Sequence, residues 1–226
     1  MSETTENLSK SASVIEVERK FTITEDSERK LQEVGASCLQ QKSFEDSYYD
    51  TDTYELTLKD HWLRQREGQW ELKSPPEQRD TESKTAQYAE SIATDEILQK
   101  LTAILKTNST ASDHYGENPD QLADFVKKHN LKAFAVFKTN RRSYRLDGGF
   151  QVDLDETDFG YRVGEIELVV GHDGDVAAAL QKIDRLAEKL GFSSTTRIAG
   201  KMDAYLQKYS SSHYAKLLAA EVLHAK

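Results

Sequence analysis

The stretch Val14-Ile15-Glu16-Val17-Glu18-Arg19-Lys20-Phe21 decides how the rest of the chain is interpreted. At the two-residue period of a β-strand, Ile15, Val17 and Phe21 share one face with Arg19, while Glu16, Glu18 and Lys20 share the other. Two carboxylates and an ammonium in a row are costly to bury unless a metal ion or a phosphate pairs with them. Taken alone, this strand is better explained by a charged face in water.

Later segments repeat the same separation of charged and apolar faces. Gly68 and Gln69 predict a hairpin turn between two of the strands involved. A half-exposed antiparallel sheet also alternates, but its wet face usually mixes Thr, Ser, Gln and Lys, whereas here acids gather on some strands and bases on others. We therefore predict an α+β fold, a single closed β-barrel with a polar interior and helices covering its apolar exterior. The repeated charged rows are Arg64/Arg66, Glu71/Lys73, Asp153/Asp155 and Glu165/Glu167.

Helical periodicity and capping signals place the covering helices between and after the strands. Further strands are expected around residues 43–51, 88–90 and 131–146, and a long loop over 74–86. The expected helices begin near Thr24, Thr94 and Asn118-Pro119, and cover 175–190, 201–209 and 214–223.

Composition restricts the class of protein. The chain has 226 residues, 37% hydrophobic and 31% charged, which suits one domain, expected over 14–226. Residues 1–13 are polar, lack the apolar core of a secretory signal and are expected to form a disordered tail. The net charge of −9 argues against wrapping a nucleic acid, and Cys38, the single cysteine, excludes an internal disulfide framework. With no apolar run of membrane-spanning length, we expect a soluble, cytoplasmic protein without membrane partners.

The motifs narrow the chemistry further. The six histidines are scattered, and no HExxH, Walker, GxGxxG or GxSxG motif is present, so zinc and nucleophilic-serine chemistry have no support. A metal here would be a hard cation held by carboxylates, such as Mg²⁺ or Mn²⁺. Arginines at alternate positions suit phosphate oxygens, so the bases would hold a polyanion.

The charged motifs and their order along the chain resemble those of the CYTH family of triphosphate tunnel metalloenzymes. The resemblance extends from about Ile15 to Tyr209. The resemblance implies an eight-stranded antiparallel tunnel with flanking helices. Segments 46–51, 60–67 and 152–161 are most similar to animal members that hydrolyse thiamine triphosphate, whereas the stretch between Pro75 and Ala86 fits the family poorly. The matching motifs are Glu16-x-Glu18-x-Lys20, Arg64-x-Arg66, Glu71-Leu72-Lys73, Arg141 with Tyr144, Asp153, Glu165-x-Glu167 and Lys201.

The resemblance also implies roles for single residues. Arg141 is preferred to Arg142 by its spacing to Tyr144, Asp155 is expected to support Asp153, and Glu90 to form a salt bridge inside the tunnel. The implied metal ligands are Glu16, Glu18, Asp153, Glu165 and Glu167, and the implied triphosphate ligands are Lys20, Arg64, Arg66, Lys73, Arg141 and Lys201.

The implied activity is Mg²⁺-dependent hydrolysis of thiamine triphosphate to thiamine diphosphate and phosphate, by a monomer acting on a small molecule. Tyr48 and Lys73 are the candidate catalytic pair, relaying a proton; the alternative is two ordinary phosphate contacts. Trp62 shares the row of Arg64 and could stack on the thiazolium ring, although a lone Trp is more often a core residue. The remaining alternatives are an inorganic or other triphosphatase or an adenylyl cyclase on the same tunnel, and a non-catalytic polyphosphate-binding module.

Overall fold

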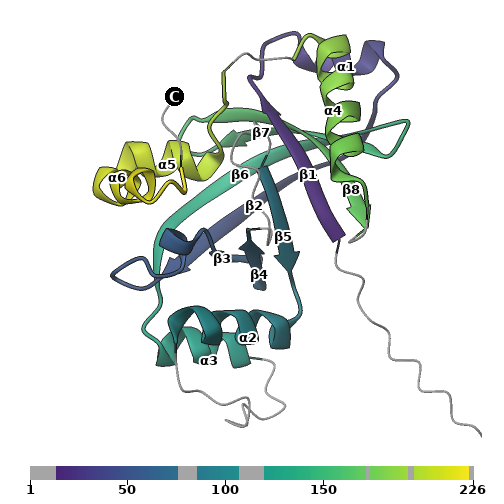
Figure 1. Cartoon of the computed structure of the whole chain (residues 1–226). Helices are drawn as coiled ribbons and strands as arrows, with labels where there is room; N and C mark the ends of the chain where they lie inside the picture. The colour runs from purple at the N-terminus through teal and green to yellow at the C-terminus, as the bar shows by residue number, and fades with distance from the viewer. Residues whose placement is uncertain (1–13, 76–85, 107–119, 172–173, 193–195, 224–226) are drawn as a thin grey trace, which may run out of the picture.

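The computed structural model of the chain describes residues 14–75, 86–106, 120–171, 174–192 and 196–223 (Figure 1). Its antiparallel strands close into a barrel in the order β1-β5-β4-β3-β2-β6-β7-β8, which confirms the predicted fold class. The strands are β1 Val14–Phe21, β2 Ser37–Asp50, β3 Trp62–Arg66, β4 Gln69–Ser74, β5 Ala86–Ser91, β6 Lys132–Leu146, β7 Phe150–Thr157 and β8 Arg162–Gly171.

Helices of the described residues lie around the outside and at the side of the barrel (Figure 1). In addition, one turn of 3₁₀-helix, η1 (Thr57–Lys59), precedes β3. The expected start of the third helix at 118–119 lies outside the described residues. The helices are α1 Ser27–Glu33, α2 Thr94–Leu105, α3 Gln121–Lys128, α4 Val176–Leu190, α5 Lys201–Tyr209 and α6 Ser211–Ala219.

The β3–β4 hairpin exists as predicted, but its turn is one residue earlier. Arg66 pairs with Gln69, so the turn residues are Glu67 and Gly68. Both have positive φ, 49° and 83°, as a two-residue turn matched to the twist of the strands requires. Gly68 takes the second turn position, whereas the sequence prediction placed it at the first. A glycine marks a turn but does not say which of the two turn positions it occupies.

The apolar faces of the strands point outward and are covered by helices. On one side, Val17 and Ile166 pack with Ile183 of α4. On another, Leu63 and Leu72 of the hairpin pack with Ile97 of α2 and with α3. Each fully buried aliphatic side chain contributes about 1.5–3 kcal/mol, so the exterior of the barrel, together with these helices, supplies much of the hydrophobic core.

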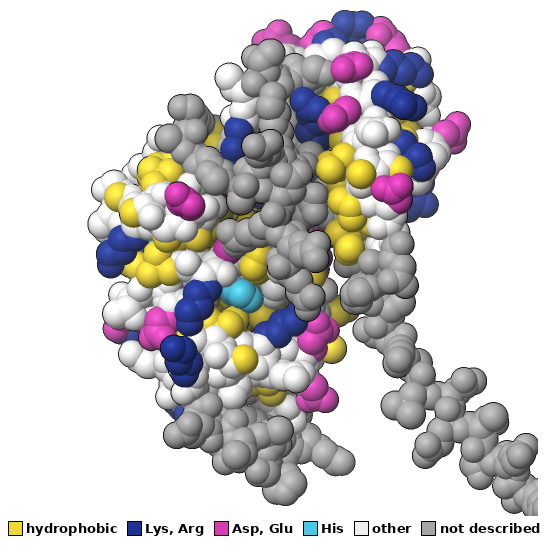
Figure 2. All heavy atoms as spheres, in the orientation of Figure 1, with side chains coloured by type: hydrophobic (Ala, Val, Ile, Leu, Met, Phe, Trp, Pro, Cys, Tyr) yellow, Lys and Arg dark blue, Asp and Glu magenta, His cyan; other side chains and the backbone are white. Residues whose placement is uncertain are grey.

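One contact shows how closely α4 and its neighbourhood pack. Phe21 of β1 stacks on Phe192, with ring centroids 4.1 Å apart. A Cβ atom at Gly164 would lie 2.1 Å from the ring of Phe21, so only glycine fits at this position of β8. Over α1 and α4, acidic and basic side chains are interspersed on the surface seen in Figure 2, as expected for helix faces in water.

The interior of the barrel has the predicted polar section and, in addition, an apolar section. Trp62 and Phe137, which share faces with Arg64 and Arg141, pack with Leu206 of α5 and Leu217 of α6. Helices α5 and α6 therefore cover an apolar section of the interior, and the charged section lies beside it. Among the described residues, no helix has both the length and the apolar character needed to cross a membrane.

Candidate functional site

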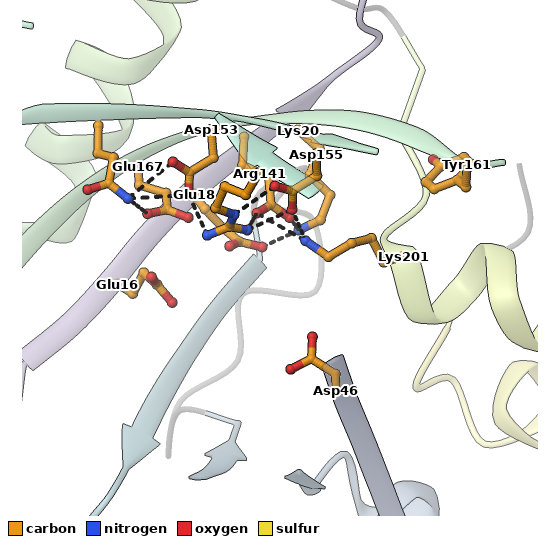
Figure 3. Close-up of polar contacts among 12 residues, drawn as sticks. Glu16, Glu18, Lys20, Asp46, Arg141, Asp153, Asp155, Tyr161, Glu167 and Lys201 are labelled. Atoms are coloured by element: carbon orange, nitrogen blue, oxygen red, sulfur yellow. Dashed lines mark hydrogen bonds and ion pairs between the residues drawn. The ribbon is translucent and has the colours of Figure 1, made fainter. Parts of the chain in front are cut away.

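The charged rows of the strands converge inside the barrel. Asp153 and Asp155 of β7 are fully buried, and Glu165 and Glu167 of β8 are 6% and 7% exposed. Figure 3 shows Asp153, Asp155 and Glu167 grouped with Glu18 and Arg141, and Asp46 on the other side of the interior with its carboxylate directed toward this group. Burial of so many ionic groups is tolerable only because most of them pair within the site.

Three carboxylates form the acidic centre of the site. Glu18, Glu165 and Glu167 each place one oxygen within 4.8 Å of the others. Burial, and then the charges of Glu16, Glu165 and Asp153, raise the pKa of Glu167 well above its ordinary value. Three hard oxygen donors at this spacing, in surroundings that disfavour a further negative charge, fit a divalent cation such as Mg²⁺.

The other two predicted metal ligands lie at the edge of this centre. Asp153 contacts Arg141, and the amide of Gln151 donates to it at 3.2 Å. Glu16 accepts from Lys73 at 3.1 Å. The structure therefore groups three of the five predicted ligands and places Glu16 and Asp153 outside that group, although Glu18 and Glu165 within it also contact Lys20.

Cations surround Asp155 and Glu165. Arg141 makes a two-pronged contact to Asp155, with both N···O distances 2.7 Å, and donates to Glu165 at 3.1 Å. Lys201 contacts Asp155 and lies 3.7 Å from Glu165. The ammonium of Lys20 also lies 3.7 Å from Glu165. Burial acts to raise the pKa of Glu165, but the charges of Lys201, Lys20 and Arg141 outweigh it and lower that pKa.

A second set of ion pairs lies on β3, β4 and β5. Arg64 donates to Glu71 at 2.6 Å and to Glu90 at 3.1 Å. Lys73 lies 3.8 Å from Glu90 in addition to its contact with Glu16. Glu90 thus makes salt bridges inside the tunnel, as expected. Burial acts to lower the pKa of Lys73, but the charges of Glu16, Glu18 and Glu90 raise it, so the amine keeps its proton.

Asp46 and Phe44 of β2 were not singled out from the sequence. Asp46 is fully buried and makes a two-pronged contact to Arg66. The ring of Phe44 lies under the guanidinium of Arg66 at 4.0 Å and under that of Arg141 at 5.6 Å. Because residues two apart share a face of a strand, the spacing could have assigned Phe44 to the interior row.

Arg142 and Tyr144 face away from the tunnel. Arg142 donates to Glu28 of α1 at 2.5 Å, and the hydroxyl of Tyr144 contacts the same carboxylate. Arg141 is therefore the arginine of this pair that lies in the interior.

The candidate catalytic pair is not in direct contact. Tyr48 stacks on Phe137 with centroids 5.9 Å apart, in the section covered by α5 and α6. Lys73 pairs with Glu16 and Glu90, and within the described part of the chain no hydrogen bond joins it to Tyr48. Trp62 lies in the same apolar section, 7% exposed, and its indole N–H donates to Asp60 at 2.8 Å.

Solved structures share this fold. A protein from Pyrococcus horikoshii OT3 superimposes with a TM-score of 0.59 at 19% identity, covering 85% of this chain and 99% of that one. A protein from Hippeastrum, described as a candidate adenylyl cyclase with a dominant triphosphatase activity, superimposes with a TM-score of 0.54 at 16% identity, covering 86% and 95%. At these identities the likeness shows the fold alone.

Sequence comparison gives relatives that are more similar. The thiamine-triphosphatase of Homo sapiens is 35% identical over 214 residues, covering 91% of this chain and 90% of the relative. The thiamine-triphosphatase of Macaca fascicularis is 36% identical over 211 residues, with the same coverage. The CYTH domain model matches residues 14–200, a span that includes all eight strands and every charged row of the tunnel. The chain therefore belongs to the CYTH domain family.

Proposed function

We propose that this protein hydrolyses thiamine triphosphate to thiamine diphosphate and phosphate inside the barrel, with Mg²⁺ as the cofactor. The chain is an enzyme that hydrolyses a triphosphate. The observation that carries the proposal is that the barrel interior holds both a cluster of carboxylates and a set of cations, contributed by strands around the barrel. This arrangement suits a metal–triphosphate complex, in which both sets of charges find partners.

Binding of the triphosphate is assigned to the interior cations. In the structure each of them contacts a carboxylate, so the cations are already oriented toward the interior, and phosphate oxygens would compete for their N–H groups. Guanidinium groups bind phosphate oxygens through two parallel hydrogen bonds, which also fixes the orientation of the chain of phosphates. The proposed ligands are Lys20, Arg64, Arg66, Lys73, Arg141 and Lys201.

Binding of the metal is assigned to Glu18, Glu165 and Glu167, with Glu16 and Asp153 beside them. These ligands are all carboxylates, the donors that Mg²⁺ prefers, and Mn²⁺ would fit the same oxygen set. When bound, the ion would supply charge neutralisation for the oxygens of the transferring phosphoryl group.

Hydrolysis needs a water molecule in line with the terminal phosphate and compensation of the charge on the leaving oxygen. Lys73 remains the proposed catalytic residue. Its salt bridges with Glu16 and Glu90 favour the role of a positioned cation at the phosphates over that of a base. Tyr48, whose ring is packed on Phe137, is proposed to present its hydroxyl to the substrate from the neighbouring section.

Recognition of the thiamine group is assigned to Trp62. Its indole lies in the apolar section of the interior, and its cross-strand neighbour on β4 is Lys73, so a substrate can reach both sections. A cation over an indole gains about 0.5–2 kcal/mol, which inorganic triphosphate cannot gain.

The deciding experiment is a substrate panel with Mg²⁺, comparing thiamine triphosphate, inorganic triphosphate and ATP. We expect the highest kcat/KM for thiamine triphosphate, and Trp62→Ala should reduce that value by about 2- to 30-fold while changing the value for inorganic triphosphate little. Preference for inorganic triphosphate, or cyclisation of ATP, would favour the corresponding alternative. Tight binding with no release of phosphate would indicate a binding module.

The proposed enzyme is a cytoplasmic monomer that acts on a small molecule. The net charge of −9 supports a small-molecule rather than a nucleic-acid substrate, and the interior holds cations that can bind a triphosphate. Light scattering of the purified chain at several concentrations tests the monomer directly.

A further inference from the structure

Asp60 holds two aromatic side chains of the interior with one oxygen atom. Its Oδ1 accepts the indole N–H of Trp62 at 2.8 Å and the hydroxyl of Tyr88 at 2.9 Å. The Asp60 residue is 6% exposed, so these hydrogen bonds are largely shielded from water. Hydrogen bonds to a buried carboxylate are about twice as strong as those between neutral groups, so both rings are held in fixed orientations.

The backbone conformation of Asp60 fixes the position of this carboxylate. Asp60 follows η1 and adopts the left-handed conformation, with φ 59° and ψ 34°. Asp50 accepts from the N–H groups of Leu56 and Thr57, at 2.9 and 2.8 Å, and the N–H of Asp60 donates to Thr57. A non-glycine residue in this conformation is uncommon. Here the hydrogen bonds at the two ends of the segment 56–60 maintain it.

The group adjoins the charged section of the tunnel. Trp62 is the cross-strand neighbour of Lys73, and Tyr88 is the cross-strand neighbour of Glu16. A molecule whose phosphates lie among the interior cations would therefore have its other end near Trp62, Tyr88 and Asp60.

We propose that Asp60 determines specificity for a substrate with a cationic head group. Its carboxylate accepts a hydrogen bond from the indole of Trp62 and gives this end of the interior a negative electrostatic potential, which attracts a cation. The inference rests on the proposed function and extends it from Trp62 to the residue that orients and polarises it. A negative charge accepting the indole N–H increases the electron density of the ring, which strengthens attraction to a cation over its face. The carboxylate adds a direct Coulomb attraction in a section shielded from water.

A purely structural role for Asp60 makes a different prediction. If the carboxylate only positions Trp62, then its loss should weaken stacking on the head group, lowering hydrolysis of thiamine triphosphate and of an uncharged analogue alike while changing inorganic triphosphate little. If the carboxylate acts through its charge, its loss should affect the cationic substrate alone, so the ratio between thiamine triphosphate and its uncharged analogue separates the two roles.

The test measures kcat/KM for three substrates: thiamine triphosphate, 3-deazathiamine triphosphate, in which a neutral thiophene replaces the thiazolium, and inorganic triphosphate. The variant is Asp60→Asn, since asparagine keeps an oxygen acceptor and tolerates the left-handed conformation but lacks the charge. Asp52→Asn, an exposed carboxylate on the surface, is the matched control.

We expect Asp60→Asn to lower kcat/KM for thiamine triphosphate about fivefold and to leave the other two substrates within about twofold. An equal loss for thiamine triphosphate and the deaza analogue, with or without a loss for inorganic triphosphate, or no loss for any of the three, overturns the proposal. The unmodified protein gives an independent arm that needs no folded variant: it should prefer thiamine triphosphate to the deaza analogue by at least about fivefold, and equal rates overturn the proposal.

The two levels of inference fail differently. If the unmodified protein does not favour thiamine triphosphate over inorganic triphosphate, the proposed function fails and this inference fails with it. If it does favour thiamine triphosphate but Asp60→Asn keeps the same ratio of kcat/KM between thiamine triphosphate and the deaza analogue, only the role of Asp60 is wrong.

Discussion

The guanidinium of Arg66 is clamped by the carboxylate of Asp46, through N···O distances of 2.7 and 2.9 Å, across the β2–β3 pair. Asp46 is fully buried, and Arg66 also rests on the ring of Phe44. Arg66, a proposed ligand of the triphosphate, is therefore held in place by a carboxylate and an aromatic ring in the absence of substrate.

Removing that clamp should destabilise the fold in a way that ligand can repair. Asp46→Asn leaves Arg66 without its counter-charge in a largely buried site, so we expect the free energy of unfolding to fall by about 2–4 kcal/mol. Inorganic triphosphate should then raise the melting temperature of the variant more than that of the unmodified protein, because the polyanion replaces the lost charge. Thermal denaturation with and without triphosphate measures both effects.

The control for this experiment is Asp52→Asn. Asp52 pairs with Lys132 at 2.8 Å, but both side chains are more than half exposed. Loss of such a surface pair should change stability by less than about 1 kcal/mol and should not alter the response to triphosphate. A similar loss of stability in both variants would contradict the importance assigned to burial.

The acidic centre should bind Mg²⁺ in the absence of substrate. EDTA should abolish turnover and Mg²⁺ should restore it. Because binding to the folded state alone stabilises it, Mg²⁺ should also raise the melting temperature, by about 2–8 °C near saturation. Glu167→Gln should remove most of this shift, whereas Glu156→Gln, at an exposed position of the same barrel, should keep it. Full activity in EDTA would remove the metal from the mechanism.

The charge of Lys73 should matter more than its ability to exchange a proton. Lys73→Met removes the cation next to Glu16 and Glu90 and should reduce kcat on the order of 100-fold. Lys73→Arg keeps a positive charge that cannot be lost at accessible pH, so it should retain a clear share of that activity. If the arginine variant is as inactive as the methionine variant, a proton-relay role for Lys73 is favoured instead. Steady-state kinetics at saturating substrate distinguishes the two.

His213 should make stability depend on pH between about 6.5 and 4. It is fully buried in α6, contacts the hydroxyl of Thr57 at 2.9 Å and stacks on Tyr54. Burial, assisted by the charge of Lys216, lowers the pKa of His213 to about 4. The unfolded state then takes up a proton first as pH falls below about 6.5, so the stability from neutral His213 is complete above that pH and is lost toward pH 4.

The contribution of this histidine can be isolated by comparison with His213→Gln. Carboxylates also titrate in this range, so the quantity to measure is the difference between the two proteins in urea unfolding at several pH values. The unmodified protein should lose up to about 3 kcal/mol more than the variant between pH 6.5 and 4. Parallel curves would show that His213 is protonated in the folded state or exposed to water.

Much of the fold could be predicted because alternation along a strand is a local property. The charged and apolar faces of 14–21, 62–66, 70–73, 150–155 and 165–169 follow from a two-residue period, and the structure turns each charged face inward. Parity places Arg141 and Arg142 on opposite faces, but the preference for Arg141 came from the spacing to Tyr144 that the family resemblance implies. The turn at Glu67–Gly68 was displaced by one residue because glycine marks a turn without fixing its register.

Other features of the site could not be predicted because they depend on neighbours that are distant in sequence. Asp46 meets Arg66 only through the register of β2 against β3, and Lys201 reaches Asp155 only because α5 starts beside the barrel. The apolar section around Trp62 exists because α5 and α6 cover it. Asp60 begins the segment 60–67 that carries the family resemblance, but its contacts with two rings emerge only from the left-handed backbone that directs its carboxylate toward them.

The sequence by itself determined which side of each strand is charged, because adjacent side chains of a strand point to opposite faces whatever the strand pairs with. Only the tertiary structure decided which charged rows face one another, because the order β1-β5-β4-β3-β2-β6-β7-β8 and the closure of the barrel are set by pairings between residues far apart in the chain. The pairing of carboxylates with cations in one section of the interior, and the apolar section beside it, follow from that order and from the placement of α5 and α6.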